Sequence, residues 1–476
     1  MATDPKFGRR AALKGLGAAA LLPVVGPGCD PLDPEPEPDP DLPPRALEEV
    51  IDTVVILMME NRSFDSYFGA LSLEEGRADV DGLQPGMGNP HPDGSVVAPY
   101  PAEQNCIADP AHSWNASHAQ FNGGLNDGFV AQHAARYGND EARRAMQYFG
   151  RDTLGPLYAM ADQHVLCERW FCSLMTSTWP NRFYSHAGQN GGVHGNSLSD
   201  ESFPSIYSRL DAAGIPWSVY FGNAPFMFLL DDVQAGENVL AYEDFAMDAQ
   251  LGRLPAVTII EPIYGRNDDH PPAHPVAGQI LISSVYQALA NSPHWGRCAL
   301  IVTYDEHGGF FDHVPPPRAA DARADEGYDQ LGFRVPTVVC GPWTRQGYVS
   351  SAVFDHTSIL AFLERRFELE PLTLRDAAAN DMYELFDQAR IDANDPLPPA
   401  VLPVIEADEA EIYAPECVTS ATGRDGDEPL TTQPELEEAI LARASGTVFD
   451  RLEQTNELYA DFLATAEARG IWRPKV

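Results

Sequence analysis

The sequence predicts an α/β fold with a central, mostly parallel sheet, helices on both faces and a helical C-terminal extension. Two observations support it: apolar runs of strand length, and stretches of helical periodicity between them. The strand-like runs are Val54–Met59, Ala256–Ile260, Ala299–Thr303 and Pro336–Cys340, and clear helical patterns cover Ile280–Leu289 and Thr357–Phe367. Strands that alternate with helices favour parallel pairing through right-handed crossovers.

The ends of the four strand-like runs carry the next signal. Each run is followed by polar or turn-forming residues, which are Glu60-Asn61, Glu261-Pro262, Asp305-Glu306 and Gly341-Pro342. In a wound parallel sheet, ligands bind beyond the carboxyl ends of the strands. The sequence therefore predicts one polar rim that serves as the active site.

Composition shifts divide the chain into successive parts. These are residues 1–29 as an export signal, 30–46 as a Pro/acid-rich tether, 47–394 as the catalytic domain and 395–476 as an acidic loop with a helical extension. Residues 70–150 are rich in Gly, Pro, Asn and His with weak periodicity, so we expect a loop-rich insertion over the rim. An apolar stripe at Phe449, Leu452, Tyr459 and Leu463 is expected to pack on the main domain.

The N-terminal segment is typical of an export signal. Arg9-Arg10 precedes Leu13-Lys14 and a short apolar stretch from Leu16 to Val25, which is too short to span a bilayer. The twin arginine resembles a Tat signal, with a generic Sec signal as the alternative. Cys29 resembles a lipoprotein acylation site and would tether the protein to a membrane. We expect a periplasmic, cell-surface or secreted protein.

The charge balance excludes one class of partner. The chain has 31 basic against 70 acidic residues, a formal net charge of −39. Such a surface repels nucleic acid and anionic bilayers, and no basic stripe with interleaved aromatic residues is present. Nucleic-acid binding is therefore not expected, and nothing in the sequence implies a protein partner. Solubility or adaptation to salt accounts for the acidity.

The strand-like run Ala299–Thr303 opens directly onto a dense cluster of charge. The segment that follows it reads Asp305-Glu306-His307-Gly308-Gly309-Phe310-Phe311-Asp312-His313. Adjacent carboxylates at the edge of a core repel one another and are costly to desolvate unless a positive charge lies between them. A divalent cation is the simplest such partner, and the histidines remain for proton transfer. This segment predicts a metal-assisted hydrolase.

Glu60 and Asn61 follow the first strand-like run in the same manner. Their side chains offer two oxygen ligands for a cation. The alternative is that Asn61 caps the next helix while Glu60 turns to solvent.

A third segment reads Thr178-Trp179-Pro180-Asn181-Arg182. A proline two residues after Thr178 suits the first turn of a helix, where the Thr178 hydroxyl would meet the positive end of the helix dipole. An alkoxide and a bound phosphate are stabilised at such a place, and Arg182 could bind phosphate oxygens from one turn on. The alternative is an ordinary helix N-cap.

Together these segments resemble the phosphoesterase family of bacterial phospholipases C and related acid phosphatases, within the alkaline phosphatase superfamily. The matching motifs are Glu60 to Asp65, Thr178 to Arg182, Thr303 to Pro316, Arg334-Val335-Pro336 and Asp355-His356-Thr357-Ser358. They occur in the right order between about Asp52 and Phe367. The tether and the C-terminal extension are not part of the match.

The resemblance implies an alkaline-phosphatase-like fold and a set of site residues. It implies metal ligands at Glu60, Asn61, Asp305 and Glu306, which would hold one or more divalent ions such as Ca²⁺ or a transition metal like Zn²⁺. It implies that Thr178 is the nucleophile. The active-site histidines are assigned to His112, His270, His313 and His356, and substrate binding to Asn181 and Arg182.

We therefore expect a two-step displacement at phosphorus. Thr178 attacks, an alcohol departs with a proton from His313 or His270, and water releases the phosphoryl product from a phosphothreonine. A phospholipase C acting on phospholipids is expected, and the alternative is an acid phosphatase that uses the same site on small phosphoesters. A sulfatase is disfavoured because Thr178 holds the place of the modified Cys or Ser. A non-catalytic surface-binding protein is the rival from a different class.

Overall fold

The computed structural model describes residues 45–233, 236–414 and 447–475, together with Cys417, Leu436, Ala439 and Ile440. The expected export signal, the acylation site at Cys29 and nearly all of the tether lie outside the described residues. Most of residues 415–446 of the expected C-terminal extension lies outside them as well. Within the described residues, no helix combines the length and the apolar character that a membrane span requires.

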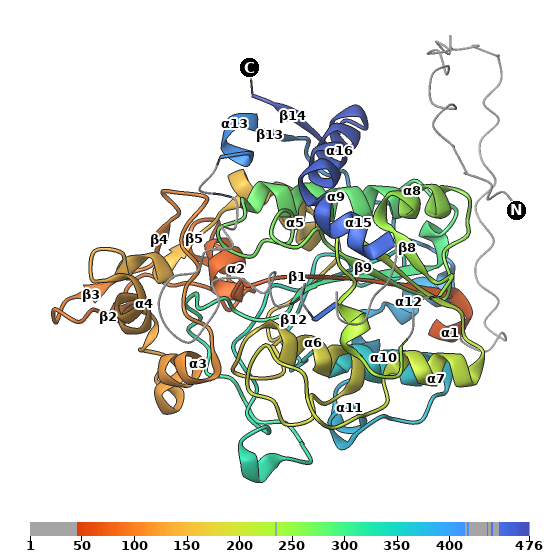
Figure 1. Ribbon diagram of the computed structural model, residues 1–476. Coiled ribbons are helices and arrows are strands. Elements are labelled where there is room, and N and C mark those ends of the chain that lie inside the picture. The colour runs from red at the N-terminus through yellow and green to blue at the C-terminus, as the bar shows by residue number, and fades with distance from the viewer. Residues whose placement is uncertain are drawn as a thin grey trace, which may run out of the picture. The chain divides into compact units, whose positions relative to one another are not determined.

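One eight-stranded sheet forms the centre of the molecule (Figure 1). Its spatial order is β12 (Tyr348–Ser350), β6 (Val165–Cys167), β11 (Val338–Cys340), β10 (Cys298–Tyr304), β1 (Thr53–Met59), β9 (Val257–Glu261), β7 (Trp217–Phe221) and β8 (Val239–Ala241). Every neighbouring pair is parallel except the two that involve β11. The predicted mostly parallel sheet is confirmed.

The fourth predicted strand runs in the opposite direction from the expected one. β11 pairs antiparallel with β10, so that Cys340 lies opposite Leu300 near the start of β10. Gly341-Pro342 consequently lies at the edge away from the carboxyl ends of β1, β9 and β10, and its assignment to the polar rim is wrong. Apolar content identified the strand, but direction depends on the connection that precedes it. The start of β11 lies at the rim instead, where Thr337 and Thr303 share a hydroxyl hydrogen bond of 2.7 Å.

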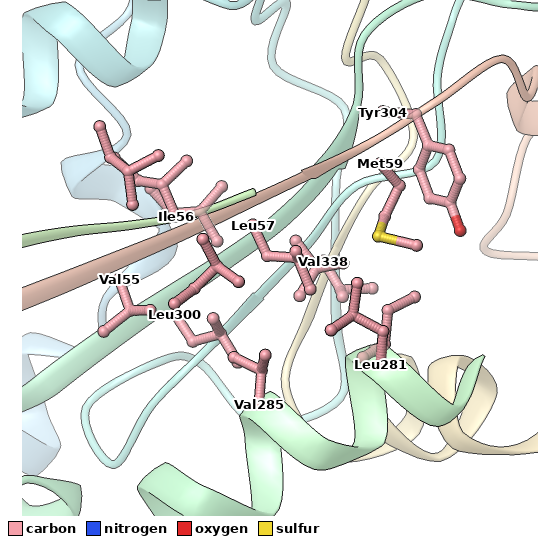
Figure 2. Close-up of a cluster of buried hydrophobic side chains, with 14 of the residues drawn as sticks. Val55, Ile56, Leu57, Met59, Leu281, Val285, Leu300, Tyr304 and Val338 are labelled. Atoms are coloured by element: carbon pink, nitrogen blue, oxygen red, sulfur yellow. The ribbon is translucent and has the colours of Figure 1, made fainter. Parts of the chain in front are cut away.

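Helices cover both faces of the sheet, as predicted (Figure 1). One layer contains α5 (Arg151–Gln163), α8 (Tyr242–Gln250) and α9 (Pro275–Ala290), and the other contains α6 (Thr178–Ala187), α7 (Ile206–Ala213) and α10 (Thr357–Phe367). Figure 2 shows Leu281 and Val285 of α9 against buried side chains of β1 and β10. The strands near the centre are buried on both faces, which explains their continuous apolar sequences.

The insertion at residues 70–150 has little regular structure but its own small core. It begins within α2 (Phe64–Leu73) and contains α3 (Trp114–Phe121), α4 (Phe129–Tyr137) and the short strands β2 (Asn89–Pro90), β3 (Val96–Val97), β4 (Tyr100–Pro101) and β5 (Gln147–Tyr148). Phe129 of α4 packs on Phe311 and Phe333, which come from the loops after β10 and before β11. These contacts attach the insertion to the loops at the carboxyl end of the sheet.

The C-terminal part packs on the main domain. Its described elements are β13 (Ile405–Ala407), α13 (Glu409–Ile412), α15 (Thr447–Glu453), α16 (Thr455–Ala468) and β14 (Trp472–Pro474). Three short helices of the main domain are α1 (Leu47–Val50), α11 (Leu374–Ala378) and α12 (Gln388–Ala393). Tyr459 and Leu463 are buried in the main core and Leu452 packs against it, as predicted, while the Phe449 side chain lies outside the described residues.

The cysteines within the described residues form one disulfide and a set of buried thiols. Cys106 of the insertion is bonded to Cys417 of the C-terminal part, a separation of 311 residues in sequence. Cys167, Cys172, Cys298 and Cys340 are free and buried. Cys298 of β10 and Cys340 of β11 lie in apolar surroundings, where a free thiol packs as a small hydrophobic side chain.

Candidate active site

The turn after β1 places Asn61 at the centre of the site. Asn61 adopts a left-handed backbone conformation with φ 57°, and its N–H donates to Asp305 Oδ1 over 2.9 Å. The turn packs closely on Gly308, where an added Cβ would lie 2.2 Å from the carbonyl oxygen of Asn61. The glycine after Asp305-Glu306 is therefore required for the two strand ends to meet.

Thr178 lies beside this turn, at the first residue of α6. Its hydroxyl donates to Asn61 Oδ1 over 3.5 Å, and it lies close enough to Asp305 to lower the pKa of that carboxyl against the larger, raising effect of burial. The helix begins where the proline predicted it, with Ser177 as the N-cap residue. Thr178 therefore joins the Glu60-Asn61 and Asp305-Glu306 segments, as the sequence predicted.

The helix N-terminus offers fewer donors than expected. The N–H of Trp179 already donates to Asn196 Oδ1 over 2.9 Å, and Pro180 has no N–H. Asn196 comes from the loop that follows α6, so this loop completes the cap. The helix dipole remains, and it favours negative charge at Thr178.

Arg182 contacts carboxylates and does not point into open space. Its guanidinium lies 3.3 Å from Glu60, 3.6 Å from Asp305 and 3.6 Å from Glu261, and Nη2 donates to the Met58 carbonyl oxygen. The side chain is buried. Arg182 thus supplies positive charge from beneath the carboxylates, and its expected binding of phosphate would require those contacts to be given up.

The Asn181 side chain is likewise occupied by contacts within the protein, here with backbone groups. Its amide oxygen accepts from the Leu174 N–H, and its amide nitrogen donates to the carbonyl oxygens of Leu174, Thr176 and Ser177. These contacts shape the loop that delivers Thr178. The structure therefore gives Asn181 a positioning role, with its donors already occupied.

Glu60, Asp305 and Glu306 form a buried group of carboxylates. Burial raises the pKa of each above its ordinary value, well above it for Glu60 and Glu306. Arg182 lowers the pKa of Glu60 and Asp305, while the Asp305 charge raises that of Glu306 further. Asp305 Oδ2 and Glu306 Oε1 have no hydrogen-bond partner. Buried oxygens of this kind fit a bound cation, so the four predicted ligands are suited to hold one.

His112 and His270 lie beside the carboxylate group. His112 Nε2 lies 3.4 Å from Asn61 Nδ2 and 3.9 Å from Glu306 Oε1, and the rings of His112 and His270 meet edge-on with centroids 5.8 Å apart. Burial lowers the pKa of His270 to about 4 and that of His112 well below its ordinary value. Both rings are therefore neutral at physiological pH.

Asp109 completes this cluster and was not predicted from the sequence. One ligand atom each from Asp109, His112 and His270 lies within 4.8 Å of the others, and all three residues are buried. The available signal was the pattern Asp109-Pro110-Ala111-His112, in which an acidic residue precedes a histidine by three positions. The weak periodicity of the insertion hid it, because no helix or strand placed the two side chains together.

His313 belongs to a separate ion network. Its Nδ1 lies 2.7 Å from Asp65 Oδ2 and its Nε2 lies 3.1 Å from Asp81 Oδ1. Arg334 donates to Asp65 and Asp312 in the same network. Burial would lower the pKa of His313, but the Asp65 carboxylate raises it to about 9. His313 is therefore a protonated histidine with a carboxylate on each nitrogen.

His356 lies behind the site. Its Nε2 donates to the carbonyl oxygen of Asp305 over 2.6 Å, and its Nδ1 accepts from the indole of Trp170 over 3.4 Å. Both ring nitrogens are thus occupied by protein groups. The contact supports the backbone of Asp305 and suits a positioning role.

Three relatives support the identity that the geometry suggests. The chain is 32% identical to "Non-specific phospholipase C1" of Arabidopsis thaliana, across 83% of each chain. It is 32% identical to "Phospholipase C A" of Mycobacterium tuberculosis, across 71% of this chain and 78% of the relative. It is also 32% identical to "Hemolytic phospholipase C" of Pseudomonas aeruginosa, across 81% of this chain and 63% of the relative.

Solved structures give more distant likenesses. The phosphonate monoester hydrolase of Agrobacterium radiobacter matches with a TM-score of 0.34 and 12% identity, across 67% of this chain and 74% of that one. A protein in the alkaline phosphatase superfamily from Vibrio parahaemolyticus matches with a TM-score of 0.33 and 11% identity, across 51% and 69%. Likenesses at this level carry no conclusion about function.

The decisive match is to a family model. Residues 51–370 match the model of the Phosphoesterase family, and this range contains Thr178, both pairs of predicted metal ligands and the Asp109–His112–His270 cluster. The chain therefore belongs to the Phosphoesterase family and is a phosphoric ester hydrolase.

Proposed function

We propose that this enzyme is a phospholipase C that hydrolyses the glycerol-side phosphodiester of phospholipids through Thr178. The observation that carries the proposal is the placement of the Thr178 hydroxyl beside Asn61 and Asp305 at the start of α6. The names of the relatives, which are phospholipases C from plants and bacteria, support the substrate class. The rival reading as a non-catalytic surface-binding protein is set aside by the family.

The first step forms a bond between Thr178 Oγ1 and phosphorus. The hydroxyl proton passes to the neighbouring Asp305 carboxylate, which delivers it to the glycerol oxygen as the bond from that oxygen to phosphorus breaks, so that diacylglycerol departs as a neutral alcohol. The head-group phosphate then remains esterified to Thr178. In the second step water attacks the same phosphorus, one water proton passes through Asp305 to Thr178 Oγ1 as the bond from that oxygen to phosphorus breaks, and the phosphorylated head group leaves.

The residues at the site suit a divalent cation. Glu60, Asn61, Asp305 and Glu306 would hold it, and a bound cation would stabilise negative charge on Thr178 and on the phosphoryl oxygens. The oxygen-rich set accommodates Ca²⁺ and Zn²⁺ alike. The helix dipole of α6 acts in the same direction, and Arg182 offsets part of the carboxylate charge in the absence of substrate.

The role of the histidines follows from their ring protons. His112 Nδ1 and His270 Nδ1 each lie 2.7 Å from a backbone carbonyl oxygen, of Pro110 and Pro271 respectively. A carbonyl can only accept, so both protons are on Nδ1 and both Nε2 atoms carry a lone pair. We therefore propose that His112 and His270 act as hydrogen-bond acceptors through their Nε2 atoms. His313 keeps a proton at neutral pH but shares it with Asp65 and Asp81.

A small substrate panel separates the proposed function from its nearest alternative. p-Nitrophenyl phosphorylcholine reports cleavage of a phosphodiester, and p-nitrophenyl phosphate reports an acid phosphatase. A phospholipase C should cleave the first faster and release diacylglycerol from phosphatidylcholine vesicles. Turnover of the monoester alone, with no diacylglycerol, would reject the phospholipase assignment and favour the phosphatase.

We also propose that the protein is exported through Tat and tethered through Cys29. The support is in the sequence, in the twin arginine at Arg9-Arg10 and in the Pro/acid tract after Cys29. Mass spectrometry of protein from the native membrane would test both points. A mature N-terminus at an acylated Cys29 is expected, and a protein that retains Arg9-Arg10 would contradict export.

A further inference from the structure

We infer that Asp109, His112 and His270 form a second cation site, which takes a divalent ion of the zinc type beside the ion held by the Glu60 group. This inference rests on the proposed function and deepens it, because the Asn61 side chain contacts both His112 Nε2 and the Thr178 hydroxyl. The ligand set of one carboxylate and two imidazoles leaves a coordination position for water or a substrate oxygen.

The hydrogen bonds of the two histidines support ligation by Nε2. Protein histidines that bind a metal through one nitrogen almost always donate from the other to a carbonyl or carboxylate oxygen, which fixes the ring. His112 and His270 both donate from Nδ1 to a backbone carbonyl oxygen over 2.7 Å. His270 is 2% exposed, and its Nε2 is buried without a hydrogen-bond partner. The buried lone pair of His270 Nε2 contributes no hydrogen bond to the fold and is suited to bind a cation.

The backbone holds the cluster firmly. Gln120 donates to the Ala111 carbonyl oxygen over 2.7 Å, and Ser117 donates to that of His112 over 3.1 Å. On the other side, Asp268 accepts from the His270 N–H over 3.1 Å. Asp109 also lies 3.8 Å from Arg136 Nη2 and 3.5 Å from His112 Nδ1, so its carboxylate is held at the cluster.

Charge favours two ions over one. Glu60, Asp305, Glu306 and Asp109 are all buried; Arg182 lies near Glu60 and Asp305, and Arg136 lies 3.8 Å from Asp109. Buried carboxylates without a counter-charge are strongly destabilising. Glu306 Oε1 has no hydrogen-bond partner and lies 3.9 Å from His112 Nε2, so Glu306 can contact ions in both sites.

The donor types distinguish the two sites. The Glu60 group offers oxygen atoms, which suit hard cations as well as zinc, whereas the imidazole pair selects zinc and its neighbours in the transition series. A protein loaded with Ca²⁺ alone would leave the Asp109–His112–His270 site weakly filled. Zn²⁺ or Co²⁺ should fill it.

The number of metal ions bound per chain tests the inference directly. Purified protein is stripped with chelator, reloaded with Zn²⁺ or Co²⁺ and dialysed, and metal per chain is counted by plasma mass spectrometry. We expect two ions per chain in the wild type and one in His270→Ala and His112→Ala. His118→Ala, a histidine of the same insertion outside the cluster, is the matched control and should keep two. Circular dichroism confirms that each variant is folded.

The Co²⁺ form gives a second readout that does not depend on any variant. Its visible absorption should rise in two phases during titration of the stripped wild type, because one site has nitrogen ligands and the other has oxygen ligands. One equivalent in the wild type, or two equivalents that persist in both His112→Ala and His270→Ala, would overturn the inference. Loss of the Thr178 mechanism would appear separately, as activity in Thr178→Ala with metal content unchanged.

Discussion

The hydroxyl of Thr178 donates to the side-chain oxygen of Asn61 over 3.5 Å, although the two residues are 117 positions apart in sequence. This contact joins the end of β1 to the start of α6. Because Asn61 also binds Asp305 through its N–H, the three residues form one unit at the carboxyl end of the sheet.

Removal of the Thr178 hydroxyl should abolish turnover and leave the protein folded. Thr178→Ala is expected to reduce kcat by at least about 10³-fold, since the nucleophile of the first step is lost. Thr178→Ser keeps the hydroxyl and should retain a measurable fraction of activity. Steady-state kinetics on p-nitrophenyl phosphorylcholine measures both, and near-normal turnover in the alanine variant would remove Thr178 from the nucleophile role.

Arg182 should matter for stability. Arg182→Met leaves Glu60, Asp305 and Glu261 without their shared buried cation, which is expected to cost about 3–5 kcal/mol in metal-free protein. Added divalent metal should restore part of this loss by supplying positive charge to the same carboxylates.

An exposed arginine gives the matched control for this prediction. Arg345 lies 3.6 Å from Glu384, and both side chains are 41% exposed. Arg345→Met should change stability by only about 0–1 kcal/mol. Thermal unfolding with and without metal compares the pair, and equal losses in the two variants would contradict the placement of Arg182.

The His313–Asp65 pair predicts how stability depends on pH. The pKa of His313 is raised to about 9, so its stabilising contribution is complete below its ordinary value near 6.5 and is lost as the pH rises through 9. The pKa of Asp65 is lowered by His313 and Arg334, against the effect of burial, and its contribution is lost at low pH as the carboxylate is protonated. The free energy of unfolding should therefore fall by about 2–3 kcal/mol between pH 6.5 and pH 9.

Urea unfolding across that pH range measures the effect. His313→Gln keeps a polar side chain but does not titrate, so its stability should be lower than wild type near pH 6 and nearly independent of pH up to 9. A wild-type curve that stays flat from pH 6.5 to pH 9 would mean that the ion pair is not formed as described.

The Cys106–Cys417 disulfide should stabilise the insertion that carries Asp109 and His112. A bond that closes a loop of this length typically contributes about 2–5 kcal/mol. Cys417→Ser, or mild reduction of the wild type, should lower the melting temperature and raise KM more than it lowers kcat. The four buried thiols should resist alkylation in the folded protein, so labelling at Cys106 and Cys417 reports the reduction.

The sequence predicted the strands near the site better than the remote ones. Val54–Met59 and Ala299–Thr303 are buried on both faces, and their continuous apolar runs correspond to β1 and β10 within one residue at either end. β6, β8 and β12 have only three residues each, so their sequences carry too little pattern to mark them. The direction of β11 depended on a long loop that local sequence does not describe.

The site residues, too, were predictable from the sequence only in part. Glu60, Asn61, Asp305 and Glu306 follow long buried strands and meet as predicted, because parallel neighbours place their ends together. Residues whose contacts depend on the tertiary fold could not be predicted from the ends of the strands. Asn181 and Arg182 lie one turn beyond Thr178, but only the fold shows that the first holds a loop and the second faces carboxylates. Asp109 lies in a segment without periodicity, where spacing gives no direction to a side chain.

The central claim is that Thr178 becomes covalently attached to phosphorus, and trapping that adduct tests it most directly. Enzyme mixed with p-nitrophenyl phosphorylcholine is quenched in acid within milliseconds, digested and mapped by peptide mass spectrometry. We predict a phosphorylcholine group on Thr178 in the wild type and none in Thr178→Ala. A burst of p-nitrophenol with the adduct on another residue, or full turnover with no protein adduct at any quench time, would contradict the account.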